Sequence, residues 1–447
     1  MIPEKSLKTT AGAVREFFYA PEKLRKTAAS YFLLNFREVD GVLVLTEGTE
    51  AIQFTRSDIA YLAEANGSHM YVTTANAMRL TYRNPFHDLL QVDAAATKRI
   101  IRHTVPDTGD MFIAVTRRNP VIAKTRSDLA YSVPLHEGGE CGAVYMERFF
   151  TAEGNTVRYS ALHNPRDLQL KRDVSAGSDS IIETPQGAGY FQMHDSTFGN
   201  ILDMATYADA LYFFRERGIT RLTGSADPTG FRLEDLCVEG YRPPLDESLV
   251  AIDGRVFYFS DDGRLCAFDG AKVKIIPDPA VAYIRFSAGL HAERGDGRYY
   301  CTVTRTDGAK CVYCFDPVPG AGFFFAVGVT AIGEDLLHGY NMYISKFSGR
   351  GYIAENDKRS TLLTTITPIS GKALLLESIA VEGTGNFTLD LYAENEGRRF
   401  TAVGGERVRL VYPLRVKELT IRVTSENDPS VCVTGIRLIG TEVAYAD

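Results

Sequence analysis

The alternation of apolar and polar positions predicts β-strands over most of the chain. From about residue 41 onward, short runs of Val, Ile, Thr, Tyr and Phe are separated by Gly, Asn and Asp, as in residues 41–45 and 255–260. Runs of this length bounded by turn residues are typical of strands. The best helical pattern covers residues 21–35, where Leu24 and Ala28 are one helical turn apart. The chain is therefore expected to be all-β, with one helix near its beginning.

One unit recurs seven times: an aromatic-rich strand, a polar turn and a second strand. The intervals between successive units are 42, 33, 67, 45, 43 and 43 residues, when one residue of each first strand serves as a marker. A period near 43 in an all-β chain is the size of one four-stranded propeller blade. The markers are Met70, Phe112, Tyr145, Tyr212, Phe257, Tyr300 and Tyr343.

This period predicts a β-propeller of six or seven blades over residues 41–365. One blade cannot bury both of its faces, whereas stacking in a ring buries them and removes long exposed edges. Ordinary hairpins in β-sandwiches are the alternative interpretation, because their strands also recur at short intervals.

The pattern changes near the end of the chain. Phe387, Leu389 and Leu391 alternate with polar residues, which is typical of half-buried antiparallel strands. Several such strands in about 80 residues suit a small sandwich. We therefore expect a C-terminal β-sandwich over residues 366–447, and we treat residues 1–40 as an N-terminal segment.

Composition narrows the possible functions. Hydrophobic residues make up 45% and charged residues 23% of the chain, as in folded proteins. The net charge of −7 argues against a dedicated nucleic-acid binder, although a local basic channel is compatible with it. The chain has no Trp, which excludes the WD-repeat family, whose blades carry a Trp-Asp pair.

Two further features bear on compartment and metal binding. No apolar run is long enough to span a bilayer, and the first residues lack the apolar core of a signal peptide. We therefore expect synthesis in the cytoplasm and reduced cysteines. Cys311 and Cys314 have the spacing of half a zinc site, but no second pair completes it. On a strand they would also face opposite sides.

No other sequence motif predicts a catalytic or ligand-binding site. Residues 194–196 read His-Asp-Ser, but adjacency in sequence is not triad geometry, and no Gly-x-Ser-x-Gly or phosphate-loop pattern is present. Residues 260–263 and 306–308 read as hairpin turns. The glycosylation patterns at Asn66 and Asn386 are interpreted as coincidental. We name no catalytic, cofactor-binding or metal-binding residue, and we expect no cofactor.

Three stretches resemble β-propeller structural proteins of tailed bacteriophage virions, of the tail, nozzle and stabilisation type. They are YMERFF at 145–150 with VRYS at 157–160 and Asn-Pro at 164–165, LYFFRERGITRL at 211–222, and GRVFYFSDDG at 254–263 with FDG at 268–270. The first is similar to an Arg-aromatic strand followed by a "Tyr-Ser … Asn-Pro" turn. The second is similar to a "Gly-Ile-Tyr-Arg-Leu" hairpin, and the third to a "Phe-Leu-Ser … Phe-Asp-Gly" blade.

The resemblance implies a non-enzymatic structural component of a virion, in its tail, neck or nozzle region, that acts through protein–protein assembly. It implies partners among the portal, adaptor, tail or capsid proteins, a homo-oligomer and no membrane. Nucleic acid would be a partner only if the protein lines a channel. Two alternatives remain open at this point. One is a carbohydrate-binding or glycoside-hydrolysing propeller with an accessory sandwich, which needs carboxylates converging at the centre of the ring. The other is a cellular interaction scaffold.

Overall fold

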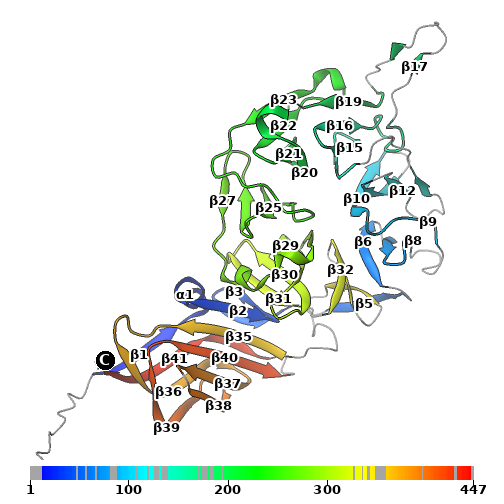
Figure 1. The fold of residues 1–447 in the computed structure, drawn as a ribbon. Helices are drawn as coiled ribbons and strands as arrows, with labels where there is room; N and C mark the ends of the chain where they lie inside the picture. The colour runs from blue at the N-terminus through cyan, green and yellow to red at the C-terminus, as the bar shows by residue number, and fades with distance from the viewer. Residues whose placement is uncertain are drawn as a thin grey trace, which may run out of the picture.

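A computed structural model shows a chain built almost entirely of β-strands (Figure 1). It describes residues 13–443 except 47–48, 56–57, 66–67, 81–87, 107–108, 118–119, 125–129, 133–138, 169–171, 174–179, 182–185, 194, 326–327, 335, 340–342, 348–358, 395 and 427–429. Within this part, no helix has the length and apolar character needed to cross a membrane.

Seven four-stranded antiparallel units, which we call blades 1 to 7, follow one another along the described chain. Blade 1 contains β6 (Ile59–Ala65), β7 (Ser68–Thr73), β8 (Ala77–Leu80) and β9 (Leu90–Gln91); blade 2 contains β10 (Thr97–Val105), β11 (Gly109–Thr116), β12 (Val121–Lys124) and β13 (Ala130–Ser132); blade 3 contains β14 (Cys141–Tyr145), β15 (Arg148–Glu153), β16 (Thr156–Tyr159) and β19 (Gly189–Gln192). Blade 4 contains β20 (Ile201–Tyr207), β21 (Ala210–Arg215), β22 (Ile219–Thr223) and β23 (Arg232–Leu236), and blade 5 contains β24 (Val250–Ile252), β25 (Arg255–Phe259), β26 (Leu265–Phe268) and β27 (Val273–Ile275). Blade 6 contains β28 (His291–Gly295), β29 (Arg298–Thr304), β30 (Lys310–Asp316) and β31 (Ala321–Phe325).

Blade 7 closes the ring with a strand from elsewhere in the chain. It contains β32 (Val329–Gly333), β33 (Leu336–Gly339) and β34 (Tyr343–Phe347), and its fourth strand is β5 (Thr49–Phe54), which pairs antiparallel with β34. The first strands of successive blades contact one another, and β32 of blade 7 contacts β6 of blade 1. The arrangement is therefore a propeller-like ring, visible face-on in Figure 1.

The sequence period corresponds to this ring, and its irregular steps have structural causes. Five of the seven markers lie on the second strand of their blade, whereas Tyr145 lies on the first strand of blade 3 and Tyr343 on the third strand of blade 7. The long step after Tyr145 spans the connection between β16 and β19. That connection includes the small hairpin of β17 (Arg172–Asp173) and β18 (Ser180–Ile181), which projects from the ring in Figure 1.

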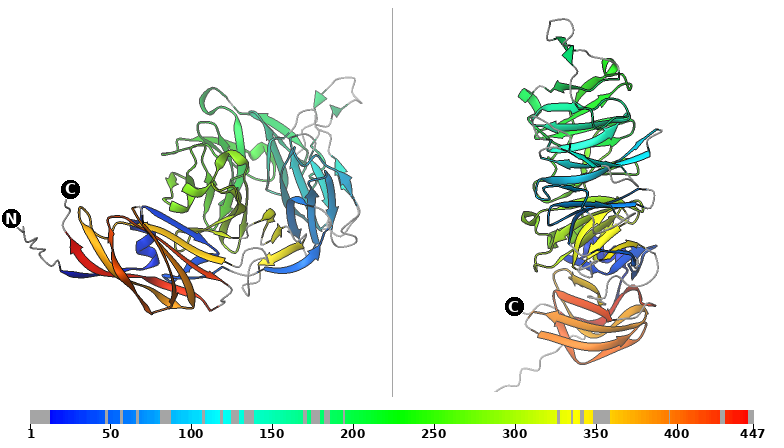
Figure 2. Two further views of the ribbon diagram at one scale, coloured as in Figure 1. Left: turned by 60° about the horizontal axis from the view of Figure 1, so that its bottom comes forward. Right: turned by 90° about the vertical axis from the view of Figure 1, so that its right-hand side faces the viewer.

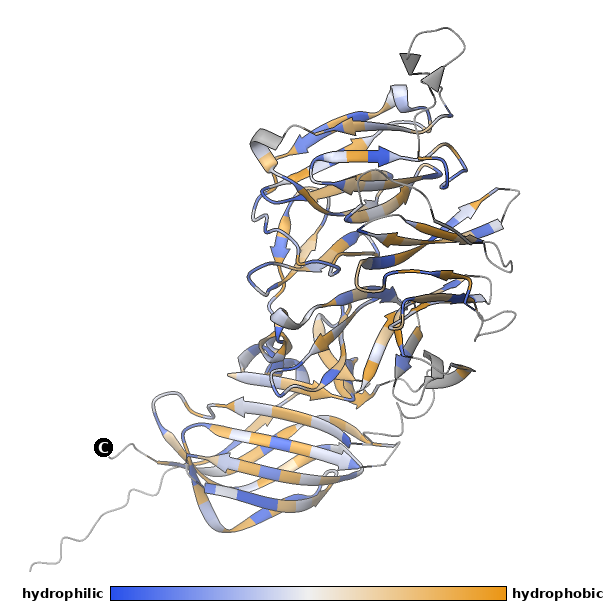
Figure 3. Ribbon diagram, turned by 45° about the vertical axis from the view of Figure 1, so that its right-hand side comes forward, coloured by the Kyte–Doolittle hydropathy of each residue, from blue (hydrophilic) through white to orange (hydrophobic). Residues whose placement is uncertain are grey.

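A second unit, which we call the C-terminal unit, lies beside the ring (Figures 1 and 2). One of its sheets has the order β3-β4-β41-β36-β39 with β1 against β41, and the other, β2-β35-β40-β37-β38, continues from β31 of blade 6. One apolar core lies between them and extends to Phe323 and Phe325 of blade 6. In Figure 3 the strands of this unit alternate between hydrophobic and hydrophilic residues. The strands are β1 (Val14–Tyr19), β2 (Ser30–Leu34), β3 (Phe36–Val39), β4 (Val42–Leu45), β35 (Arg359–Ile366), β36 (Ala373–Thr384), β37 (Asn386–Ala393), β38 (Glu396–Val403), β39 (Arg407–Val416), β40 (Leu419–Glu426) and β41 (Cys432–Val443).

Strand pairing groups the chain differently from the expected divisions at 40/41 and 365/366. β1 and β4 pair with β41, and β2 pairs with β35, so most of the N-terminal segment is part of the C-terminal unit. The helix expected over 21–35 is also shorter. α1 covers Pro21–Thr27, and residues 30–34 form β2 instead, because a central strand between β31 and β35 buries both of its faces.

A buried histidine lies where the ring closes, and it predicts a loss of stability in acid. His338 on β33 is fully buried, with its ring nitrogens 3.2 Å from Thr55 Oγ1 and 2.7 Å from Thr330 Oγ1. Burial lowers the pKa of His338 to about 4, and Asp58 opposes this only in part. In the unfolded chain His338 therefore binds a proton below about pH 6.5, whereas in the folded chain it binds one only below about pH 4.

As the pH falls from about 7.5 to about 5, protonation of this residue in the unfolded chain should lower the free energy of unfolding by about 2 kcal/mol. Urea unfolding followed by tyrosine fluorescence across this range measures the loss. The His338→Gln variant should be less stable at neutral pH but should lack this part of the acid dependence, so the two stability curves should converge as the pH falls. Parallel curves would contradict the assignment.

Candidate functional site

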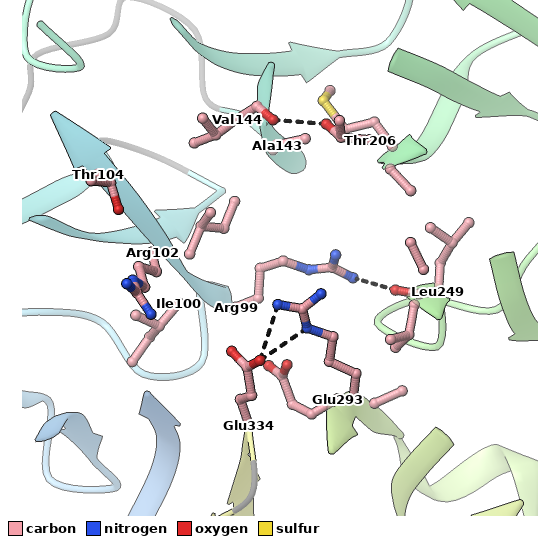
Figure 4. Close-up of a pocket in the computed structure, with 18 residues that line it drawn as sticks. Arg99, Ile100, Arg102, Thr104, Ala143, Val144, Thr206, Leu249, Glu293 and Glu334 are labelled. Carbon is pink, nitrogen blue, oxygen red and sulfur yellow. Dashed lines mark hydrogen bonds and ion pairs between the residues drawn. The ribbon is translucent and has the colours of Figure 1, made fainter. Parts of the chain in front are cut away.

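A cavity of about 420 Å³ lies at the centre of the ring. Its walls come from the first strands of blades 2 to 6 and from Glu334, which directly follows β32. Figure 4 shows that charged side chains, among them Arg99, Glu293 and Glu334, lie close to one another in this space. The cavity is therefore the place where the ring could bind or transform a ligand.

β-Bulges occur in four of the strands that surround this centre. In four of the seven first strands the pairing register slips after the first residue, leaving one residue extra on β6, β10, β20 and β32. Bulges are common beside functional sites because they change where a side chain points. The residues that follow three of these bulges are Tyr61, Arg99 and Asp203.

Arg99 and Asp203 form an ion pair between blades 2 and 4. Arg99 Nη2 lies 2.9 Å from Asp203 Oδ2, and the same nitrogen donates to the carbonyl oxygen of Leu249, before blade 5, at 3.5 Å. Asp203 Oδ1 accepts a hydrogen bond from the Met204 amide at 2.8 Å. Burial raises the pKa of the Asp203 carboxyl, and Arg99 opposes this. The pair therefore links blades that are not neighbours in the ring.

His291 of blade 6 is held between two carboxylates. Its Nδ1 lies 3.1 Å from Glu247 Oε2, and its Nε2 lies 3.2 Å from Glu293 Oε1. Tyr61 of blade 1 donates to Glu247 and to the carbonyl of Thr97. Burial alone would lower the pKa of His291, but the two carboxylates outweigh it and raise that pKa to about 9. His291 is therefore a cation at neutral pH.

The backbone of Glu247 is held in an unusual conformation at this cluster. Its φ is +58°, in the left-handed region, which costs a residue other than glycine about 1 kcal/mol. The Ala292 amide donates to the Glu247 carbonyl at 2.8 Å, which fixes the loop before β24 against β28. This strain is maintained by the contacts that place the Glu247 carboxylate between Tyr61 and His291.

These contacts leave little capacity for acid–base chemistry. Asp203, Glu247 and Glu293 each accept hydrogen bonds from a cation or a phenol, and Glu334 pairs with Arg294 at 3.0 Å. A general acid–base pair needs one free proton donor and one free base across the substrate. A cationic histidine between two carboxylates provides neither. Carboxylates do converge at the centre of the ring, but they neutralise cations there.

The motifs considered in the sequence lie elsewhere. Cys311 and Cys314 are buried in two different apolar clusters, so they do face opposite sides of β30. His194 lies outside the described residues, and Asp195 begins the short helix α2 (Asp195–Phe198). Both Asp-Gly stretches are turns, as expected, with φ of +73° at Gly263 and +89° at Gly308. Among the described residues, no group of three or more metal-ligating side chains occurs.

None of the central residues was identified from the sequence. A usable signal does exist, since the third residue of the first strand is polar in four blades: Tyr61, Arg99, Asp203 and Glu293. This alignment requires the first strand of each blade to be known. The repeat markers lay mainly on second strands, so they did not give this register.

No family model and no curated protein matches the chain. Among solved structures, the computationally designed Ika8 protein has a TM-score of 0.38 and 8% identity, covering 68% of this chain and 100% of that chain. The WD40 repeats of RRP9 have a TM-score of 0.39 and 8% identity, and the match covers 65% of this chain and 89% of that chain. BBS1N in complex with ARL6DN has a TM-score of 0.40 and 10% identity, and the match covers 68% of this chain and 97% of that chain. These are likenesses to propeller-like arrangements of small sheets, and they say nothing about what this chain does.

Proposed function

We propose that the protein is a non-enzymatic structural component of a bacteriophage virion, in its tail, neck or nozzle region, and that it acts through protein–protein assembly. In this proposal a seven-bladed propeller is the rigid scaffold, and the C-terminal unit is a β-sandwich that docks onto partners. The virion setting rests on the sequence resemblance of the three blade stretches. The assembly role rests on the surface of the C-terminal unit.

The centre of the ring supports a scaffold role. Its ion pairs join blade 2 to blade 4 and hold blade 6 to the loop before blade 5, so charged groups that could serve catalysis instead connect the blades. Lys98 and Arg117 of blade 2 also pair with Asp246 in that loop. Such links hold the blades in a fixed arrangement, which suits a building block.

The observation that carries the proposal is a bulge on β39. Ser378 pairs with Arg409 while Leu376 pairs with Leu414, so residues 410–413 of β39 lie opposite the single residue 377 of β36. Leu410 stays buried, whereas Val411 is 87% exposed and Tyr412 is 74% exposed. Two large apolar side chains are thus exposed next to each other, and tyrosine is enriched at the energetic centres of interfaces.

The surroundings of the bulge favour a second copy of this chain as its first partner. β38 and β39 each end a sheet and pair with no further described strand, which leaves open edges of the kind that associate. β39 also exposes Arg407, Arg409 and Arg415, and the exposed Lys417 directly follows it, whereas the whole chain has a net charge of −7. A basic strand on an acidic protein fits a head-to-tail contact, which generates a ring where the rotation between copies closes.

Solution mass tests this proposal. Light scattering after size exclusion at micromolar concentration should give a multiple of the 49.4 kDa chain. The variant with Val411→Ser and Tyr412→Ser should shift the distribution to the monomer. Val318→Ser is the matched control, because Val318 is 95% exposed in the turn between β30 and β31, away from the bulge, and it should leave the mass unchanged.

A monomer at every concentration would contradict the homo-oligomer, and equal masses for wild type and the bulge variant would contradict the interface. The virion setting has its own test, which is detection of the protein by mass spectrometry in purified particles of a phage that encodes it. Its absence from such particles would leave the interaction scaffold as the better proposal. For the carbohydrate alternative, the paired central carboxylates do not favour glycoside hydrolysis.

A further inference from the structure

A second cavity, of about 430 Å³, lies where the ring meets the C-terminal unit. Its floor is one face of the sheet that runs through both parts. The strand registers place Leu34, Thr361 and Thr424 in one row across β2, β35 and β40. They place Phe32, Leu363 and Arg422 in the next row. The floor therefore combines apolar side chains, hydroxyl groups and the guanidinium of Arg422, and Arg359 at the start of β35 also lines the cavity.

The facing wall comes from blade 6, and it carries the guanidinium of Arg305. Arg305, in the turn between β29 and β30, lies over the Phe32 ring at 5.4 Å from its centroid, and it pairs through Nε with Asp307 at 3.2 Å. Tyr283 of the 3-10 helix η2 (Pro279–Tyr283) packs on the same ring at 4.9 Å between centroids. Aromatic rings and a guanidinium group therefore lie next to each other in this cavity.

Two donors in this cavity lack partners in the described structure. Arg305 Nη1 is buried and makes no hydrogen bond there. A buried N–H without an acceptor costs about 1–3 kcal/mol, so it calls for an explanation such as a ligand. Arg422 is exposed toward the cavity and forms no hydrogen bond or ion pair with described residues, since the neighbouring Asp390 is bound by Arg399 at 2.6 Å.

We propose that this cavity binds a small organic anion, with a phosphate or carboxylate group between Arg305 and Arg422 and a ring-shaped body against Phe32, Tyr283 and Leu363. Guanidinium groups bind both anions through charge-assisted hydrogen bonds. Aromatic and apolar walls around a few convergent polar groups are the usual composition of small-molecule sites. Among the described residues that line the cavity, Asp307 is the only one with a carboxylate, and it is engaged by Arg305 and by the Ala309 amide.

Calorimetric titration of the full chain tests the site with three probes: phenyl phosphate, inorganic phosphate and benzyl alcohol. Phenyl phosphate should bind at least about 10-fold more tightly than either of the others, because only it offers both the anion and the ring. Arg422→Gln should weaken phenyl phosphate binding by about 10-fold or more. Glucuronate, as a second anionic probe, distinguishes a sugar ring from an aromatic ring as the preferred body.

Arg255→Gln is the matched control, because Arg255 is an exposed arginine at the start of β25 that does not line the cavity. It should bind phenyl phosphate like the wild type, and both variants should unfold at the wild-type temperature. No saturable binding of phenyl phosphate or glucuronate up to about 10 mM would overturn the proposal. Equal affinity in wild type and Arg422→Gln, or equal affinity for phenyl phosphate and inorganic phosphate, would overturn it too.

Discussion

Replacing Arg148 by leucine is expected to lower the free energy of unfolding by about 3–5 kcal/mol. Arg148, at the start of β15, is fully buried. It donates to the carbonyl oxygens of Ser160 and Gly187 at 2.7 Å and of Ala226 at 3.0 Å. Ala226 belongs to blade 4, so this single side chain ties blade 3 to its neighbour. Leucine would leave three carbonyls without this donor.

Lysine at this position should cost less than leucine, because it keeps the charge but not the planar fork that reaches all three carbonyls. Arg255→Leu is the matched control, since Arg255 is an exposed strand residue at the start of β25, and its effect should stay within about 0.5 kcal/mol. Urea unfolding followed by tyrosine fluorescence measures all three variants. A leucine variant as stable as the Arg255 control would show that the buried guanidinium does not support the blade contact.

The second large effect is expected at the centre of the ring. Asp203→Leu should destabilise the fold by about 3 kcal/mol, because it leaves the Arg99 guanidinium without its ion-pair partner. Arg99 is only 18% exposed at its side chain. Glu247 and Glu293 also act on its charge, which is why we expect the lower end of the usual range.

A double-mutant cycle separates the pair from the rest of the cluster. Arg99→Met alone should also be destabilising, whereas the double variant Arg99→Met with Asp203→Leu should recover most of the loss, because no uncompensated charge then remains. Thermal unfolding monitored by circular dichroism gives the four stabilities. Additive losses in the double variant would mean that the pair does not join blades 2 and 4 as one energetic unit.

The repeated blades could be predicted from sequence because their signal is local. Blades 1 to 6 each bury aromatic side chains on the second strand, as in Leu211–Phe214, and several turns need residues that tolerate the left-handed region, such as Gly263. The stretches that resemble virion propellers are of the same kind, since they fall on strands of blades 3, 4 and 5. They carry packing and turn information, which is why they indicate a fold more directly than a function.

The strand pairings between the two ends of the chain and the central cluster could not be predicted in the same way. Pairing of β1 with β41 depends on contacts between residues more than 400 positions apart, which leave no pattern in any short window. Arg99 and Asp203 likewise meet only after two blades have formed and two bulges have turned their side chains inward. Neither residue is distinguished in the sequence from a charged residue on a solvated strand.

The pairing of β1 with β41 also constrains the order in which the chain can fold during its synthesis. A ribosome adds about 5–20 residues per second, so β1 waits on the order of 20–90 s before its partner strand exists. β5 waits in the same way for β34. During translation, blades 1 to 6 can form in order, while the apolar residues of β1, Phe17 and Phe18 among them, have no partner strand. Ring closure and completion of the C-terminal unit therefore come after blades 1 to 6, and the apolar residues of β1 are exposed until then.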